Sequence, residues 1–288
     1  MEKGAGHRRM RKKFLIGLDL DDTVFTKEKK ITEKTRQSIL QANAKGAEIV
    51  FLSGRPYFGI TDEIFAFPDM HYLVTSNGAL TLDPVKKRPL HGNFLEEDFV
   101  FETIEKLKKE GLLFNVFIGG IGYIEERDYE RFLKRYEDSY LKSYIIASRR
   151  PVRNLAGKIR EMEEEGYGTE NIWLITDKKE KREELYREFA EKGVNLLRTK
   201  DYDLEMVSPM ADKGRELLYI AEELGIEREK ILAVGDSEND QGMIRAAGCG
   251  VAMGNAAAAT KELADYVTED NAHDGAAKAI DRFMLEHV

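Results

Sequence analysis

The sequence predicts an α/β protein built on a doubly wound parallel sheet, with a second, α+β domain inserted into the chain. Three observations lead to this fold class. Short apolar runs alternate with helical patterns near both ends, this alternation breaks down in the middle, and polar residues directly follow several of the apolar runs. A doubly wound sheet gathers such strand ends at one edge, where ligands bind. The 288 residues are enough for one large or two medium domains.

The first expected strand lies in the stretch FLIGLDLDDT, from Phe14 to Thr23. Its apolar run has the length of a buried parallel strand and leads into Asp19 and Asp21. Negative charge concentrated at the tip of a buried strand costs stability unless a cation or a reaction requires it there. A turn in which Asp21 and Asp22 cap the next helix explains the same residues about equally well.

The next elements follow the β–α–β order of a parallel, right-handed crossover. Thr32 is the expected N-cap of the first helix. The second strand delivers Ser53-Gly54 at its end, and the third ends at Ser76-Asn77-Gly78, a turn that favours positive φ. The expected strands in this part of the chain are 47–52 and 71–75, followed by a small hairpin of 79–82 and 88–90.

From about Asn93 the helical patterns become strongly charged and the strands follow one another closely. Adjacent strands with less regularly interleaved helices predict an α+β insert with an antiparallel sheet, open on one face. We place this insert, the cap, at 84–206, and the core domain at 1–83 and 207–288. The expected strands of the insert are 113–118, 122–125, 171–176, 194–199 and 203–207.

After the insert the regular alternation returns, and the fourth polar strand end appears. Lys213 opens a helix, and the strand at 231–234 delivers Gly235-Asp236, followed by Asn239-Asp240. The remaining expected elements are a helix from 239 to 246, a strand at 250–253, a helix at 257–264, a short strand at 266–267 and a helix from 274 onward.

The residues at these strand ends suit a metal and a phosphate group. Carboxylates such as Asp19, Asp21 and Asp236 are hard oxygen ligands suited to Mg²⁺, which usually shares its shell with phosphate. The Ser53 hydroxyl, the Gly54 N–H, Lys213 and Asn239 are donors for the phosphate oxygens. Each of these residues also has a structural explanation: Ser53-Gly54 as a tight turn, Lys213 as a surface lysine and Asn239 as a helix cap. The neighbouring Asp240 can likewise be a first-turn carboxylate.

The amino-acid composition limits the binding partners and the cellular compartment that we expect for this protein. The 45 basic and 53 acidic residues give a net charge of −8, which argues against a nucleic-acid-binding surface. The sequence contains no apolar run of transmembrane length and no signal-peptide pattern, so we expect no membrane partner. A single cysteine excludes an internal disulfide and fits a reducing, cytoplasmic location. The sequence does not indicate an oligomeric state.

Taken together and in order, the motifs resemble the haloacid dehalogenase (HAD) superfamily, with its HAD-like, Rossmannoid core. Within it, the chain resembles the Cof-type (subfamily IIB) phosphatases, whose cap is inserted between the second and third motifs. One departure is Asp22, where many members have glycine. The resemblance covers essentially the whole chain, and the cap contains no site motif that matches. The segments that carry it are DLDDT at 19–23, LSGR at 52–55, TSNGA at 75–79, Lys213, GDSENDQGM at 235–243 and GVAMGNA at 250–256.

The resemblance implies an Mg²⁺-dependent phosphoric monoester hydrolase. Asp19 would be the nucleophile that forms an aspartyl-phosphate, and Asp21 would act first as acid and then as base. The metal would be held by the Asp19 and Asp236 carboxylates and the Asp21 carbonyl. The phosphate would be held by Leu20, Ser53, Gly54, Lys213 and Asn239, with Thr23 and Asp240 in supporting positions.

Two other functions remain open at this stage. A sugar phosphomutase of the phosphomannomutase type would need additional basic residues on the cap, for which Arg127, Arg131, Arg149, Arg150 and Arg153 are candidates. A non-catalytic phospho-ligand sensor would be expected to lack Asp21, which is present. The sequence does not identify the substrate, because cap loops that read the leaving group cannot be placed from pattern alone.

Overall fold

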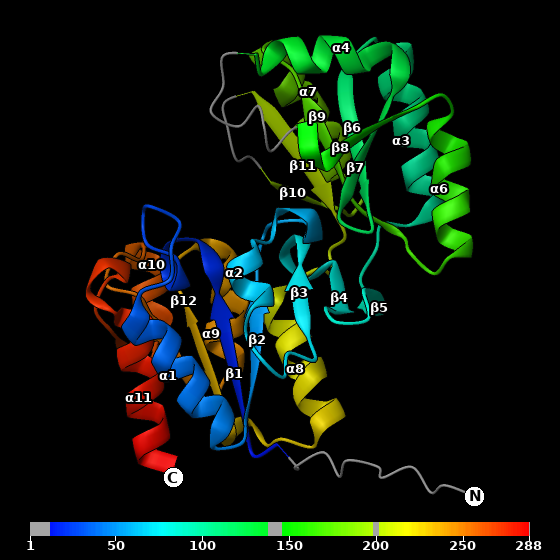
Figure 1. The fold of residues 1–288 in the computed structure, drawn as a ribbon. Coiled ribbons are helices and arrows are strands. Elements are labelled where there is room, and N and C mark those ends of the chain that lie inside the picture. The colour runs from blue at the N-terminus through cyan, green and yellow to red at the C-terminus, as the bar shows by residue number, and fades with distance from the viewer. Residues whose placement is uncertain (1–11, 138–145, 198–201, 288) are drawn as a thin grey trace, which may run out of the picture. The chain divides into compact units, whose positions relative to one another are not determined.

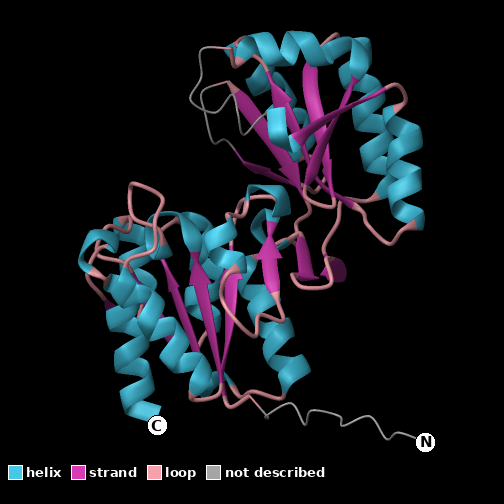
Figure 2. Cartoon of the chain, in the orientation of Figure 1, coloured by secondary structure: helices cyan, strands magenta, loops and turns pink. Residues whose placement is uncertain are grey.

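A computed structural model describes residues 12–137, 146–197 and 202–287. The chain divides into two compact units, shown in Figures 1 and 2. The first unit comprises Met1–Phe51, Ala66–His71 and Leu217–Val288, and the second comprises Leu52–Phe65 and Tyr72–Glu216. The described residues form two sheets, one of eight strands and one of six. None of the described helices is long and apolar enough to cross a membrane.

The eight-stranded sheet has the order β14-β13-β12-β1-β2-β3-β4-β5. Its strands β1, β12, β13 and β14 pair in parallel, whereas β3, β4 and β5 pair antiparallel. The predicted doubly wound α/β sheet is therefore confirmed. The strand bounds are β1 Phe14–Asp19, β2 Ala47–Leu52, β3 Leu73–Thr75, β4 Leu80–Asp83, β5 Arg88–Gly92, β12 Ile231–Gly235, β13 Cys249–Ala252 and β14 Tyr266–Val267.

Helices flank this sheet as the sequence predicts. The side chain of Thr32 accepts a hydrogen bond from the N–H of Thr35 and caps α1, as predicted. Helices α1 and α11 pack against each other (Figure 1), and α9 packs against β12 and β13. The helix bounds are α1 Glu33–Ala44, α2 Asp62–Phe65, α8 Lys213–Leu224, α9 Gln241–Ala246, α10 Ala258–Leu263 and α11 Gly275–His287.

The six-stranded sheet lies in the second unit and has the order β10-β11-β9-β6-β7-β8. Its strands are β6 Leu113–Ile118, β7 Ile121–Glu125, β8 Arg149–Val152, β9 Thr169–Ile175, β10 Asn195–Leu197 and β11 Asp203–Val207. The helices beside it are α3 Glu97–Lys109, α4 Glu126–Arg135, α6 Leu155–Glu164 and α7 Lys179–Ala190. The end of the strand predicted at 194–199 lies outside the described residues.

This second sheet departs from the sequence prediction in two respects. Strand β8 pairs in parallel with β7, so the sheet is mixed rather than wholly antiparallel. Alternate strand residues such as Phe114 pack with α3, α6 and α7, whereas Leu113 faces the other side, where Phe132 of α4 packs. That face is therefore partly covered rather than open.

Candidate active site

Three buried carboxylates form a cluster in the first unit. Oxygen atoms of Asp19, Asp236 and Asp240 all lie within 4.8 Å of one another. The cluster follows from the sheet: β1 and β12 are parallel neighbours in which Leu18 is opposite Val234, so Asp19 and Asp236 follow this pair by one and two residues and emerge at the same end of the two strands. Residues more than 200 positions apart thus meet at one edge of the sheet, as the sequence predicts.

Neighbouring polar groups hold Asp236 and Asp240 in place. The hydroxyl groups of Thr23 and Ser237 donate to the two carboxylate oxygens of Asp236, at 3.2 and 3.0 Å. Asp240 Oδ2 accepts from the backbone N–H groups of Asp236 and Ser237, at 3.0 and 2.9 Å. A Cβ atom at Gly235 would lie 2.5 Å from Asp240 Cβ, so this arrangement requires glycine there.

The electrostatics of the cluster favour a cation. Burial, reinforced by the nearby Asp240 carboxylate, raises the pKa of Asp236 to about 6. Three converging carboxylates repel one another, and oxygen ligands suit hard divalent ions. The donor set therefore fits a divalent metal. Asp240 belongs to this cluster, although the sequence indicated only a supporting position for it.

The turn Leu20–Val24 carries the next predicted site residues. Leu20 is fully buried, whereas the carboxylate of Asp21 is partly exposed and pairs with Lys29 Nζ at 2.8 Å. The side chain of Asp21 is therefore not among the three clustered carboxylates. Asp22 has a left-handed backbone, with φ of 61°, and is exposed. Its carbonyl oxygen accepts a hydrogen bond from Asn255 Nδ2 at 2.8 Å.

Ser53 and Gly54 directly follow β2 and belong to the second unit. Ser53 is buried, and its N–H donates to the Val74 carbonyl oxygen at 2.9 Å. Its own carbonyl oxygen accepts from the N–H of Asn77 at 3.0 Å. The hydroxyl oxygen of Ser53 accepts from the N–H of Arg55 at 3.1 Å, while Gly54 is exposed at the strand end. These bonds tie the loop after β2 to the turn after β3.

Lys213 begins α8 in the same unit and is only 1% exposed, so it is not a surface lysine. A Cβ atom at Gly78 would lie 2.7 Å from the backbone of Asp212, so glycine allows the chain before Lys213 to pack against the turn after β3. Asn93 Nδ2 donates to the Gly78 carbonyl oxygen at 2.9 Å and to Glu216 Oε1 at 2.6 Å. Lys213 thus begins a helix that is anchored to this turn.

Asn239 lies in the first unit and is exposed, in the turn Glu238–Asp240 that precedes α9. The structure thus brings Asp19, Thr23, Asp236 and Asp240 together in the first unit, with Asn239 adjacent in sequence. It ties Ser53 and Lys213 to one turn in the second unit. Sequence reasoning gave no role to Ser237, although its position directly after Asp236 was the available signal.

The cap arginines named above have acidic or aromatic neighbours. Arg131 pairs with Asp128 at 3.4 Å. Arg149 is buried with its guanidinium group over the ring of Phe117, at 4.5 Å from the ring centroid. Further pairs join Arg127 to Asp128 at 3.5 Å and Arg153 to Glu126 at 3.3 Å, and Arg150 lies over the ring of Phe58 at 5.7 Å.

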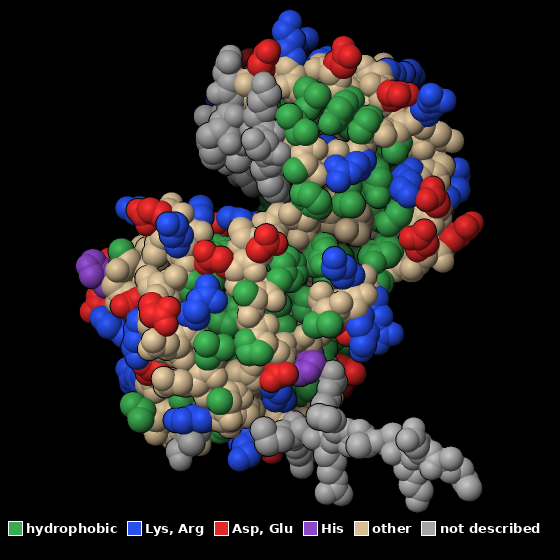
Figure 3. All heavy atoms as spheres, viewed as in Figure 1, with side chains coloured by type: hydrophobic (Ala, Val, Ile, Leu, Met, Phe, Trp, Pro, Cys, Tyr) green, Lys and Arg blue, Asp and Glu red, His purple; other side chains and the backbone are tan. Residues whose placement is uncertain are grey.

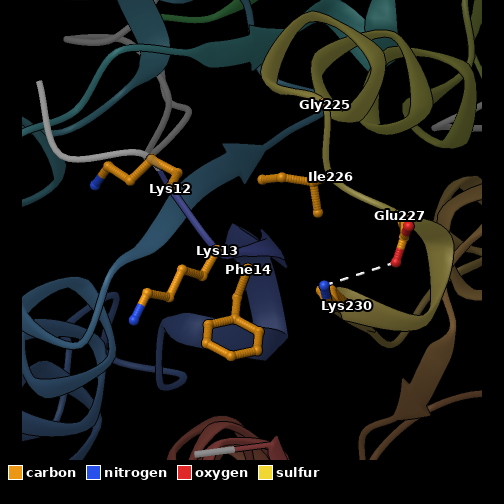
Figure 4. A pocket seen from close by; sticks show the side chains of 7 residues that line it. All are labelled: Lys12, Lys13, Phe14, Gly225, Ile226, Glu227 and Lys230. Atoms are coloured by element: carbon orange, nitrogen blue, oxygen red, sulfur yellow. Dashed lines mark ion pairs between the residues drawn. The ribbon is translucent and has the colours of Figure 1, made fainter.

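A cavity of about 400 Å³ lies near the start of β1, and Figure 4 shows its lining. Phe14 is the first residue of β1 and Asp19 the last, so the cavity is at the opposite end of that strand from the carboxylate cluster. Glu227 in its wall pairs with Lys230 at 3.6 Å. The cavity is therefore separate from the candidate active site.

Comparison with known proteins identifies the family. Residues 16–280 match the model of the haloacid dehalogenase-like hydrolase family. The match spans most of the chain, which therefore belongs to this family. The phosphatase YwpJ of Bacillus subtilis is 27% identical over 95% of this chain and 99% of that protein. The 5-amino-6-(5-phospho-D-ribitylamino)uracil phosphatase YcsE of Bacillus subtilis is 27% identical over 94% of this chain and 96% of that protein.

Solved structures agree with this assignment. A haloacid dehalogenase-like hydrolase from Bacteroides thetaiotaomicron matches with a TM-score of 0.78 and 27% identity, over 94% of this chain and 99% of that chain. One from Bacillus subtilis matches with a TM-score of 0.71 and 27% identity, over 93% and 98%. The expected resemblance to Cof-type phosphatases, and with it a phosphoric monoester hydrolase, is confirmed.

Proposed function

We propose that this chain is an Mg²⁺-dependent phosphatase that hydrolyses small phosphomonoesters through an aspartyl-phosphate. The observation that carries the proposal is the cluster of Asp19, Asp236 and Asp240 at the ends of two adjacent parallel strands. Asp19 is the nucleophile: its carboxylate oxygen bonds to phosphorus while the ester P–O bond breaks. Water then attacks phosphorus, releases inorganic phosphate and restores the Asp19 carboxylate.

Asp21 transfers the protons in both steps. It first donates a proton to the leaving ester oxygen, and it then removes a proton from the attacking water. Its carboxylate is partly exposed beside Lys29 and outside the cluster, which suits a group that must exchange protons with substrate and solvent. Asp22, which is exposed next to it, is free to face solvent or the leaving group.

A bound Mg²⁺ would be held by the carboxylates of Asp19 and Asp236 and by the backbone carbonyl of Asp21, with Asp240 holding its neighbours. When bound, it would offset the negative charge of the carboxylates and of the transferring phosphoryl group. Thr23 orients Asp236 through its hydrogen bond. The phosphate oxygens are held by Lys213 and by four further donors: the Leu20 N–H, the Ser53 hydroxyl, the Gly54 N–H and Asn239.

We further propose that the cap, 84–206, selects the substrate among sugar phosphates and phosphorylated cofactors. A related protein is named as a phosphatase of 5-amino-6-(5-phospho-D-ribitylamino)uracil, a phosphorylated compound of this kind. A cytoplasmic location, a small phosphate ester as ligand, and the absence of nucleic-acid or membrane partners stay predictions. Both signs of charge are interspersed on the face seen in Figure 3, which supports the absence of a nucleic-acid partner.

The phosphomutase alternative is less well supported. It requires free cationic groups on the cap to retain a second phosphate, yet Arg127, Arg131 and Arg153 pair with carboxylates. The sensor alternative predicts no turnover at all. Mixing the protein with sugar monophosphates and measuring both free phosphate and isomerised sugar phosphate separates the three functions.

Metal dependence is tested by removing divalent ions with EDTA and restoring Mg²⁺. We expect phosphate release to stop in EDTA and to return when Mg²⁺ is added in excess, because the clustered carboxylates need a counter-charge. Mn²⁺ and Ca²⁺ serve as comparisons, since both prefer oxygen ligands but differ from Mg²⁺ in size. Full activity in EDTA would contradict the metal assignment.

A further inference from the structure

Glu170, the second residue of β9, is a fully buried carboxylate that joins two segments of the second unit. Its Oε2 accepts a hydrogen bond from the hydroxyl group of Ser76, in the turn after β3. Its Oε1 accepts a hydrogen bond from the N–H of Gly120 at 2.6 Å, in the hairpin between β6 and β7. Burial raises the pKa of this carboxyl group, so these two donors are what make its position tolerable.

The turn that Glu170 contacts is conformationally demanding. Ser76, Asn77 and Gly78 are three consecutive residues with positive φ, of 51°, 58° and 94°. Side-chain-bearing residues in this region are strained and persist only where their surroundings hold them. The bond from Ser76 to Glu170 supplies part of that restraint.

The same turn is bonded to the loop that carries Ser53. The N–H of Asn77 donates to the Ser53 carbonyl oxygen at 3.0 Å, and the N–H of Ser76 donates to the Arg55 carbonyl oxygen at 2.9 Å. Gly78 packs against the backbone that leads into Lys213. A displacement of the turn therefore displaces groups that hold phosphate in the proposed function.

The hairpin on the other side of Glu170 contacts the continuation of this loop. A Cβ atom at Gly120 would lie 2.4 Å from Tyr57 Cβ, so the hairpin packs closely on Tyr57. The N–H of Phe58 donates to the Gly120 carbonyl oxygen at 3.4 Å. Glu170 thus sits between two segments that both touch the chain after Ser53.

We propose that Glu170 is a positioning residue for phosphate binding, which fixes the turn Ser76–Gly78 and through it Ser53. The inference rests on the proposed function, since it assigns Ser53 to the phosphate. Glu170 thus contributes to phosphate binding although it lies in the predicted cap, 84–206, where no sequence motif indicates a functional residue.

The test compares Glu170→Ala, Glu170→Gln and Ser76→Ala with the parent protein. We expect Glu170→Ala to lower kcat/KM by about 10- to 100-fold and to weaken inhibition by inorganic phosphate, because small misplacements of binding groups have effects of this size. Glu170→Gln should stay within about threefold of the parent, since the amide oxygen can accept from Gly120 and the amide nitrogen can donate to Ser76. Ser76→Ala should lose activity, and the double variant Glu170→Ala/Ser76→Ala should be no worse than Glu170→Ala alone.

Glu48→Ala is the matched control for loss of a buried carboxylate. Glu48 is fully buried and bonded to His71 at 2.9 Å, five residues before Ser53 on β2, roughly 17 Å along an extended strand. It should lower Tm without changing kcat/KM. If Glu170→Ala lowers Tm to a similar degree and leaves kcat/KM and phosphate inhibition unchanged, Glu170 is structural only and the inference is wrong.

Hydrogen exchange supplies a measurement that needs no turnover. Amide exchange at Asn77 should accelerate in Glu170→Ala and in Ser76→Ala, while exchange in β12 stays as in the parent. Unchanged exchange at Asn77 overturns the inference. A parent protein that releases no phosphate from any ester overturns the proposed function instead, and if Glu170→Ala does not fold, Ser76→Ala carries the same test.

Discussion

At Asp236, a few neighbouring groups set both the orientation and the pKa of a carboxylate in the candidate active site. Two hydroxyl groups donate to its carboxylate, yet burial and Asp240 raise its pKa to about 6. The hydrogen bonds fix the orientation of the side chain, and the raised pKa reports an unfavourable concentration of negative charge. A divalent cation would relieve this charge, so orientation and metal affinity are set by the same few neighbours.

Replacement of Asp19 or of Asp21 by asparagine should lower kcat for different reasons. We expect Asp19→Asn to lower kcat by about 10³-fold or more, because an amide is neither a nucleophile nor an anionic ligand. Asp21→Asn should lower kcat by about 10²- to 10⁴-fold, since only proton transfer is lost. Steady-state phosphate release, with Tm measured for each variant, checks both values; an Asp19→Asn variant as active as the parent is the contradicting result.

Glu205 should make the stability of the second unit depend on pH. Burial, reinforced by the Asp203 carboxylate, raises its pKa from the usual 4.5 to about 7 in the folded protein. Between these two values the folded state binds a proton that the unfolded state has released, so stability falls as pH rises through this range. Glu205→Gln cannot release a proton, and it should therefore be more stable than the parent above pH 7.

At pH 8 we expect the free energy of unfolding of Glu205→Gln to exceed that of the parent by about 1–2 kcal/mol. This is less than the full shift in pKa implies, because Glu205 keeps some solvent exposure. The advantage should disappear near pH 4.5. Urea unfolding of both proteins at pH 4.5, 6 and 8 measures it. A difference in stability that does not change with pH would show that ionisation of Glu205 has no part in it.

At the scale of elements, Thr32 joins two helices of the first unit. Its hydroxyl oxygen accepts from the N–H of Thr35 at 3.1 Å and its hydroxyl group donates to Asp274, directly before α11, at 2.6 Å. We expect Thr32→Ala to lower the free energy of unfolding by about 1–2 kcal/mol, as the loss of an N-cap does. Thr32→Ser keeps the hydroxyl group and is the control. Chemical denaturation measures the change, and equal stability of both variants would contradict it.

The sequence predicts some elements well because their local signals agree with their surroundings. Strands β2, β6 and β11 have the predicted bounds, since each is a short run rich in apolar residues between turn signals. The positive φ angles after β3 follow from the Ser76-Asn77-Gly78 sequence. In contrast, β8 has the sequence RRPV, with two arginines and a proline, so its pairing with β7 is set by the tertiary structure.

The candidate active site, too, can be predicted only in part from the sequence. Strand order and polar strand ends indicate that Asp19 and Asp236 meet, because a parallel register aligns the ends of β1 and β12. Membership of Asp240 in the cluster and the pairing of Asp21 with Lys29 depend on side-chain directions within tight turns. Such directions follow from a few backbone dihedral angles, including the left-handed φ of Asp22. The hydrophobic periodicity of the sequence does not predict these angles.

At the scale of the whole molecule, the proposed division between core chemistry and cap specificity can be tested by exchange. We expect that replacing 84–206 with the cap of a related phosphatase changes the preferred phosphate esters, because the cap would contact the leaving group. Asp19 should stay indispensable in the chimera. A panel of phosphate esters measures the preference, and an unchanged preference in a folded chimera would contradict the division.

The pairing of β1 with β12 has a consequence for how the protein is made in the cell. Leu18 is opposite Val234, so β1 can pair with β12 only after more than 200 further residues have been synthesised, whereas β2, its other neighbour in the sheet, follows soon after it. Contacts between such distant segments form late and slowly. A nascent chain that has not reached Asp236 therefore cannot assemble the carboxylate cluster.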